Sequence, residues 1–85
     1  EGEYQLIHLL KEYVGKKDYD KAIEILTQAL EYDDTNVDAM YFLGRCYQQK
    51  SDEDKAKEYY NKIINDYSTS ARVGEAKRRL RELGE

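Results

Sequence analysis

The sequence contains no proline and no tryptophan, and it has only one cysteine and one histidine. A single cysteine excludes an internal disulfide, so the fold must be held by packing alone. No apolar run reaches the roughly 20 residues that a membrane span requires, so no direct membrane insertion is predicted. The sequence does not begin with methionine, which fits a processed protein or an excised domain. The lack of a targeting signal therefore carries no weight.

Basic residues are fewer than acidic ones, 14 against 18, and the net charge is −4. This balance argues against a nucleic-acid or anionic-membrane binder, because affinity for phosphate requires clustered Lys and Arg. The segment after residue 71 is the exception, since it is locally basic. Acidic residues interrupt that patch, so a solvated helix at the end of the fold explains it better than a contact with nucleic acid or lipid.

Neither of the two rare reactive side chains has the companions that catalysis or metal binding requires. Cys46 has no His–acid pair to activate it, so a small buried thiol is the expected role. His8 has no Cys or His at ligand spacing. The acidic runs 33–34 and 52–54 lack the alternating ligands and central glycine of a calcium loop, and they suit helix starts. The sequence therefore predicts no enzyme activity, no cofactor and no metal site.

Apolar residues recur every three or four positions along almost the whole chain, which is the period of an amphipathic helix. Five helices are predicted, with these residues on their apolar faces: Leu6, Leu9, Leu10 and Tyr13; Ala22, Ile23, Leu26, Ala29 and Leu30; Met40, Leu43, Gly44 and Tyr47; Ala56, Tyr59, Tyr60, Ile63 and Ile64; Val73, Ala76, Leu80 and Leu83. Asp18 and Asp52 suit the N-caps of the second and fourth helices. Thr35 followed by Asp38 resembles a capping box for the third, and Gly84 suits a C-terminal stop. No strand is predicted.

The sequence also repeats itself at an offset of 34 residues. The matching pairs are Leu9 with Leu43, Tyr13 with Tyr47, Asp18 with Asp52, Lys21 with Lys55, Ala22 with Ala56 and Glu24 with Glu58. A period of this length is typical of stacked helical hairpins, each of which buries a face against its neighbour. The repeat fades in the last helix, where Lys77 and Arg78 stand one period after Leu43 and Gly44. Charge at those positions predicts a capping helix with a solvated outer face.

The repeated residues resemble the tetratricopeptide repeat family. The second unit carries Tyr41, Leu43–Gly44, Tyr47, Asp52, Ala56 and Tyr60, and the first carries Leu9, Tyr13, the run 18–22, Ala29 and Asp33. Leu10 departs from the family's small residue, and Asp34 and Ser68 stand where proline is usual. The tail is similar to repeats of bacterial cell-envelope and membrane-anchored proteins. The resemblance therefore implies a soluble domain of the bacterial cytoplasm or of the cell envelope.

The resemblance implies an all-α fold of two hairpins plus a C-terminal capping helix, five antiparallel helices in a right-handed superhelical stack. One domain spans residues 1–85, with repeat 1 at about 3–36, repeat 2 at about 37–70 and the capping helix at about 71–84. It also implies a protein-interaction module whose partner is a protein or peptide. The alternative is a structural module, either a homo-oligomer or a fragment of a longer array, because two repeats fall below the usual minimum of about three.

In this family, ligands usually lie on the concave face that the first helices of the hairpins form. On the repeat grid, the predicted partner-binding residues are Tyr4, Ile7, Lys11, Val14, Tyr41, Phe42, Arg45, Gln48 and Arg79. Lys11, Arg45 and Arg79 stand one period apart, so three cations are predicted to line up across the groove. Such a groove suits a peptide that carries a carboxylate flanked by apolar residues. The alternative is an ordinary solvated face.

Phe42 is the second notable side chain on this face. It either anchors a partner or packs under a neighbouring side chain, and burial is the commoner fate of a lone Phe. The family's best-known variant holds a terminal carboxylate with asparagines and cations. The matching places here are Ile7, His8, Lys11, Tyr41 and Phe42, with no asparagine among them. A clamp for a chaperone tail is therefore not predicted.

Overall fold

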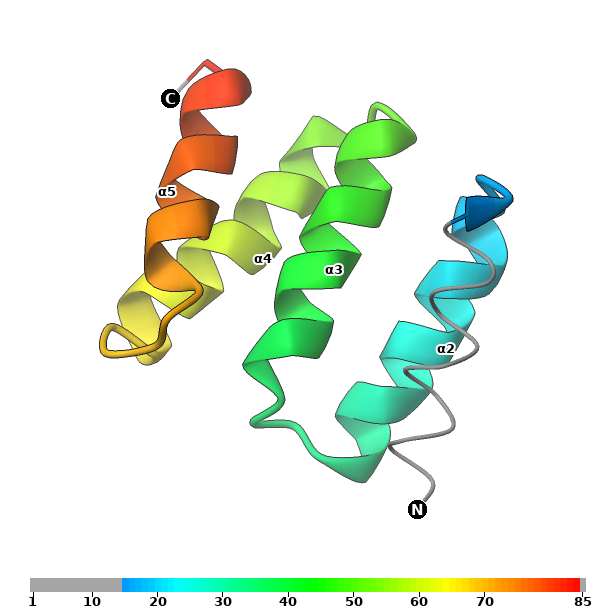
Figure 1. The fold of residues 1–85 in the computed structure, drawn as a ribbon, viewed down its shortest axis with the longest axis horizontal. Helices are drawn as coiled ribbons and strands as arrows, with labels where there is room; N and C mark the ends of the chain where they lie inside the picture. Colours follow the sequence, from blue (N-terminus) through cyan, green and yellow to red (C-terminus); the bar gives the residue numbers. More distant parts are fainter. Residues whose placement is uncertain (1–14, 85) are drawn as a thin grey trace.

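The structure is a computed structural model that describes residues 15–84, and four α-helices make up most of this part of the chain. They are α2 (Tyr19–Tyr32), α3 (Val37–Gln49), α4 (Glu53–Asp66) and α5 (Val73–Glu82). Figure 1 shows α3 running between α2 and α5, with α4 crossing behind. The all-helical prediction is confirmed for residues 15–84, which contain no strand. The count of five helices is not supported, because the first predicted helix falls outside the described residues.

The turns that precede α2 and α4 repeat at the 34-residue period. Asp18 and Asp52 cap the two helices as predicted, each accepting a hydrogen bond from the backbone N–H three residues later. Lys17 and Ser51, directly before the caps, both have a positive φ, 60° and 66°. The left-handed residue reverses the chain and the carboxylate satisfies a free N–H at the helix start. The same short sequence pattern therefore forms the same turn before α2 and before α4.

The predicted capping box at the start of α3 is wrong. The N-cap is Asn36, whose Oδ1 accepts a hydrogen bond from Ala39 N at 3.1 Å. Thr35 instead donates its hydroxyl and its N–H to Asp33 Oδ1, at 2.6 and 3.0 Å. These two bonds lower the pKa of Asp33. Asp33 closes an Asx turn at Thr35, and the N-cap falls one residue later, on Asn36.

The core consists of two clusters that both include residues of α3, which packs on α2 and on α4. Its buried members are Ala22, Ile25, Leu26, Ala29, Ala39, Met40, Tyr41, Leu43, Cys46, Ala56, Tyr60, Ile63, Ala76 and Leu80. Gly44 lets α3 and α4 approach closely, because a Cβ there would lie 2.6 Å from Tyr60 Cε1. The ring of Tyr60 occupies the space next to Gly44.

α5 continues the stack. Ala76 and Leu80 are fully or nearly buried against the α3–α4 hairpin, whereas Lys77 and Arg78 are exposed. Gly84 follows with φ +88°, the left-handed geometry expected of a helix stop. Within the described residues, no helix is both long and apolar enough to cross a membrane.

Candidate functional site

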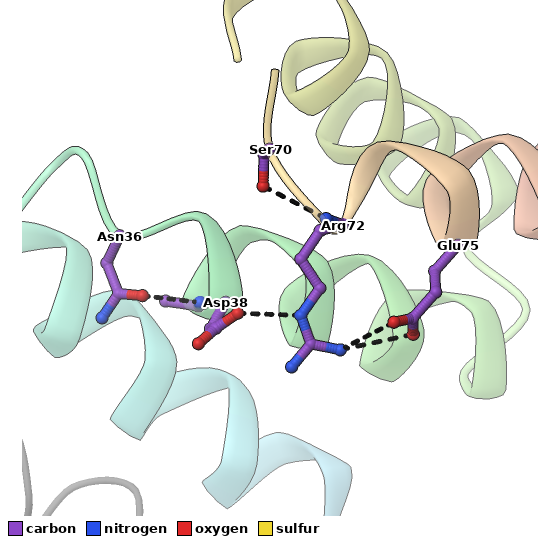
Figure 2. A network of polar contacts seen from close by, with 6 residues as sticks. Asn36, Asp38, Ser70, Arg72 and Glu75 are labelled. Carbon is purple, nitrogen blue, oxygen red and sulfur yellow. Dashed lines mark hydrogen bonds and ion pairs between the residues drawn. The ribbon is translucent and has the colours of Figure 1, made fainter. Parts of the chain in front are cut away.

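α3 and α5 are tied together by side chains that stand one repeat apart. Arg72 Nε donates to Asp38 Oδ1 at 2.8 Å, and Arg72 Nη1 lies 3.3 Å from both carboxylate oxygens of Glu75. Figure 2 shows the guanidinium held between the two carboxylates. At the start of α5, Arg72 N donates to Ser70 Oγ at 3.1 Å. Arg72 therefore joins the last helix to the preceding hairpin.

The same guanidinium covers two aromatic rings of α3. Its central carbon lies 4.9 Å from the ring centre of Tyr41 and 5.2 Å from that of Phe42. The two rings meet edge to face at 5.5 Å. Tyr41 is only 1% exposed, so it offers no open apolar surface to a partner. It was predicted to lie outward, but the neighbouring helix covers it.

A second set of hydrogen bonds links α4, α3 and α5 further along. Tyr60 Oη donates to Gln48 Oε1 at 2.9 Å, and Gln48 Nε2 donates to Glu82 Oε1 at 3.3 Å. Arg79 Nη1 lies 3.0 and 3.1 Å from the two oxygens of Glu82, and Arg79 Nε donates to Tyr41 Oη at 3.3 Å. The bonds from Arg79 and Gln48 lower the pKa of Glu82. Gln48 and Arg79 thus already have partners within the chain.

Arg45 differs from these neighbours. Its Nε is buried and makes no hydrogen bond to any described residue. Arg45 lines a pocket of about 170 Å³ together with Tyr19, Phe42, Cys46 and Gln49. Tyr19 comes from the start of α2 and the other four side chains from α3, so the pocket lies beside the α2–α3 hairpin. Phe42 is half-buried, between the pocket and the guanidinium of Arg72.

The predicted row of three cations is only partly within the described residues. Lys11 lies outside them, as do Tyr4, Ile7 and Val14. Arg45 and Arg79 occupy the expected equivalent positions but differ in chemistry, because Arg79 is paired and the Nε of Arg45 is not. Binding by these residues stays a prediction.

Sequence reasoning missed the ties between α3 and α5, although a signal was present. Asp38 with Arg72 and Gln48 with Glu82 are complementary side chains separated by one full period. In a stack, equivalent positions of successive first helices lie side by side, so such a pair is placed to interact. It also missed Tyr19 and Gln49 at the pocket, because neither residue is matched one period away in the sequence.

The described side chains offer little for catalysis or metal binding. Among residues 15–84, no group of three His, Cys, Asp or Glu side chains could hold a metal ion. Cys46 is 2% exposed, and burial raises the pKa of its thiol to about 11. The thiolate that would act as nucleophile is therefore scarce at neutral pH.

The recurring turn, the helical hairpin that continues into α5 and the one-period contacts define a helical-repeat protein. A tetratricopeptide repeat family model matches residues 13–80, and the chain belongs to that family. Tetratricopeptide repeats generally mediate protein–protein interaction and are typically scaffolds rather than enzymes.

Two curated relatives give the wider setting. The chain is 42% identical over 69 residues to the Sel1-repeat-containing protein YjcO of Escherichia coli K12, covering 73% of this chain and 30% of the relative. It is 42% identical over 45 residues to the general transcriptional corepressor ssn6 of Schizosaccharomyces pombe, covering 53% of this chain and 4% of the relative. The chain thus spans less than a third of the length of each.

Proposed function

We propose that this domain binds an extended or helical segment of a partner protein in the concave groove of its first helices. The groove would be lined by α3 and α5. The residues predicted to face it from the first helix, Tyr4, Ile7, Lys11 and Val14, would line it as well. The segment would carry a carboxylate flanked by apolar residues.

One observation carries this proposal: Phe42 and Arg45 share a pocket that no described side chain fills. An aromatic wall beside a cation provides both apolar contact and charge recognition. Arg72 with Asp38, Arg79 with Tyr41 and Gln48 with Glu82 are paired between α3 and α5, and these pairs would hold the proposed groove in a fixed shape. In a preformed groove, fewer side chains lose conformational entropy on binding.

A peptide array screened with the labelled domain tests the proposal. Peptides that combine Asp or Glu with apolar neighbours should bind better than scrambled, uncharged or basic ones. For the best peptide, amide chemical shifts should change along α3 near Phe42 and Arg45 and stay constant on the outer face of α4. Equal binding of acidic and basic peptides would contradict the groove assignment, as would shifts confined to α4.

A second role is supported by the lengths of the relatives. Because the chain covers 30% of one relative and 4% of the other, it fits equally well as a segment of a longer array whose function is structural. Sedimentation over a range of concentrations separates the two. Self-association with no peptide binding supports the structural role, and a concentration-independent monomer that binds peptides supports the interaction module.

A further inference from the structure

Arg45 and Arg79 occupy equivalent positions in successive repeats, 34 residues apart. Within residues 15–84, only Arg79 of the two has a hydrogen-bond acceptor for its Nε. Arg79 donates its Nε to Tyr41 Oη and pairs through Nη1 with Glu82. The Nε of Arg45 is buried and finds no acceptor among the described residues. A buried donor of a charged group without an acceptor is costly and rare in folded proteins, so its presence calls for an explanation.

The sequence explains why the chain itself does not supply the acceptors. One period before Tyr41 stands Ile7, which has no hydroxyl. One period before Glu82 stands Gln48, a neutral amide that is already bonded to Tyr60 and Glu82. The two residues that accept hydrogen bonds from Arg79 are Tyr41 and Glu82. At the corresponding positions relative to Arg45, the chain has residues that do not accept from it. Both repeats therefore have the arginine, but only one has its acceptors.

The space around Arg45 fits a small anionic group with an apolar stem. The pocket measures about 170 Å³, and Phe42, Cys46 and Tyr19 contribute the apolar part of its walls. Arg45 is its only charged side chain among the described residues that line it. A carboxylate pairs well with the guanidinium of Arg45, while the methylene groups of the same side chain pack on the walls.

We infer that the Arg45 pocket recognises the side-chain carboxylate of a Glu or Asp in the partner segment. This inference rests on the proposed function and narrows it, because it assigns charge recognition to Arg45 and not to a row of equivalent cations. A side chain fits the pocket better than a chain terminus. A terminus would bring a polar backbone amide against the walls formed by Phe42 and Cys46.

The test follows the Nε–Hε resonances of the arginines by ¹⁵N NMR. The first probe is propionate, which is added to the 85-residue chain. A titration with chloride at equal ionic strength is the control. We expect propionate to shift the Arg45 resonance while that of Arg79, already bonded to Tyr41 and Glu82, stays in place. An unmoved Arg45 resonance overturns the carboxylate site, and equal shifts of the two arginines overturn its restriction to Arg45.

The second arm uses the best acidic peptide from the array and the same peptide with Glu→Gln. Replacing the carboxylate should weaken binding about tenfold or more, and Arg45→Gln in the protein should weaken it by the same factor. With Arg45→Gln, the two peptides should bind equally. The matched control is Arg78→Gln on the exposed face of α5, which should leave both affinities unchanged. Persistent discrimination in Arg45→Gln overturns the assignment.

Two further outcomes identify other occupants. If amidating the peptide C-terminus weakens binding while Glu→Gln does not, the pocket takes a terminus and the inference is wrong. If Glu1→Gln, Glu3→Gln or Glu12→Gln moves the Arg45 resonance in the absence of any probe, the occupant is the chain itself. If no peptide binds but propionate still shifts Arg45, the proposed function fails while the carboxylate site stands.

Discussion

Arg72 stands one 34-residue period after Asp38, and its Nε donates to Asp38 Oδ1 at 2.8 Å while its guanidinium covers the ring of Tyr41. Asp38 is 60% exposed, so the ion pair alone is screened by water and worth little. The contact with two aromatic rings adds to it, because cation–π contacts become stronger as the site is shielded from solvent. The combination makes Arg72 a polar tie between α3 and α5 that also shields two aromatic rings.

The first prediction concerns this tie. Arg72→Ala should lower the free energy of unfolding by about 1–2 kcal/mol, because it removes the ion pair and uncovers Tyr41 and Phe42. Arg72→Lys should recover only part of the loss, since an ammonium cannot reproduce the planar stacking. Urea denaturation followed by circular dichroism measures both. Arg78→Ala, on the exposed face of α5, is the control and should change stability by less than about 0.5 kcal/mol. Equal effects of the two alanine variants would contradict this account.

The helices that the structure describes were predictable because their signals are local. Asp18 and Asp52 cap helices through contacts within three residues, and the apolar spacing of each helix needs no knowledge of its neighbours. The error at Thr35 arose because Asn36, one residue later, is also a good N-cap, and it is Asn36 that accepts from Ala39 N. Sequence patterns rarely decide such a competition.

The binding face was less predictable than the helices. Its positions follow from the period, but whether a side chain there is free depends on the adjacent helix. Tyr41 and Arg79 both lie on the predicted face, yet they bond to each other. The missing hydrogen bond of Arg45 is noticeable only by comparison with Arg79, whose Nε has an acceptor. Solvent exposure of a groove residue is a property of the stack and not of one repeat.

The second prediction concerns the close approach of α3 and α4. Gly44→Ala should lower the free energy of unfolding by about 1–3 kcal/mol, because the new Cβ would lie 2.6 Å from Tyr60 Cε1 and 2.9 Å from Tyr60 Cζ. Tyr60 is fully buried and bonded to Gln48, so its ring has little freedom to move. Thermal or urea unfolding measures the loss.

Gly74 provides the matched control for Gly44. It lies within α5, and a Cβ there would meet nothing within 4 Å. Gly74→Ala should therefore raise stability by about 0.5 kcal/mol, because alanine is the better helix former. A Gly44→Ala protein as stable as Gly74→Ala would show that the α3–α4 contact is looser than described.

The third prediction concerns the left-handed turn before α4. Ser51 has φ 66°, a conformation that costs free energy for a residue with a Cβ. Ser51→Gly should raise stability by about 0.5 kcal/mol, because relief of the strain exceeds the extra entropy of glycine in the unfolded chain. Ser51→Ala retains a Cβ and should bring no gain. A gain with alanine equal to that with glycine would indicate that the serine hydroxyl, and not the backbone, causes the strain.

The last prediction is a loss of stability in alkali through Cys46. Burial raises the pKa of this thiol from 9.0 to about 11, so the folded state keeps its proton where the unfolded state has released it. The resulting stabilisation is fully present below about pH 9 and is lost as the pH rises from 9 towards 11. Urea midpoints should therefore fall over this range, and Cys46→Ala should show a shallower fall than the parent protein. In parallel, a thiol reagent at pH 8 should label the folded protein far more slowly than the urea-unfolded chain. Rapid labelling of the folded protein, or identical pH slopes for parent and variant, would show that the thiol is not held in the core between α2 and α3.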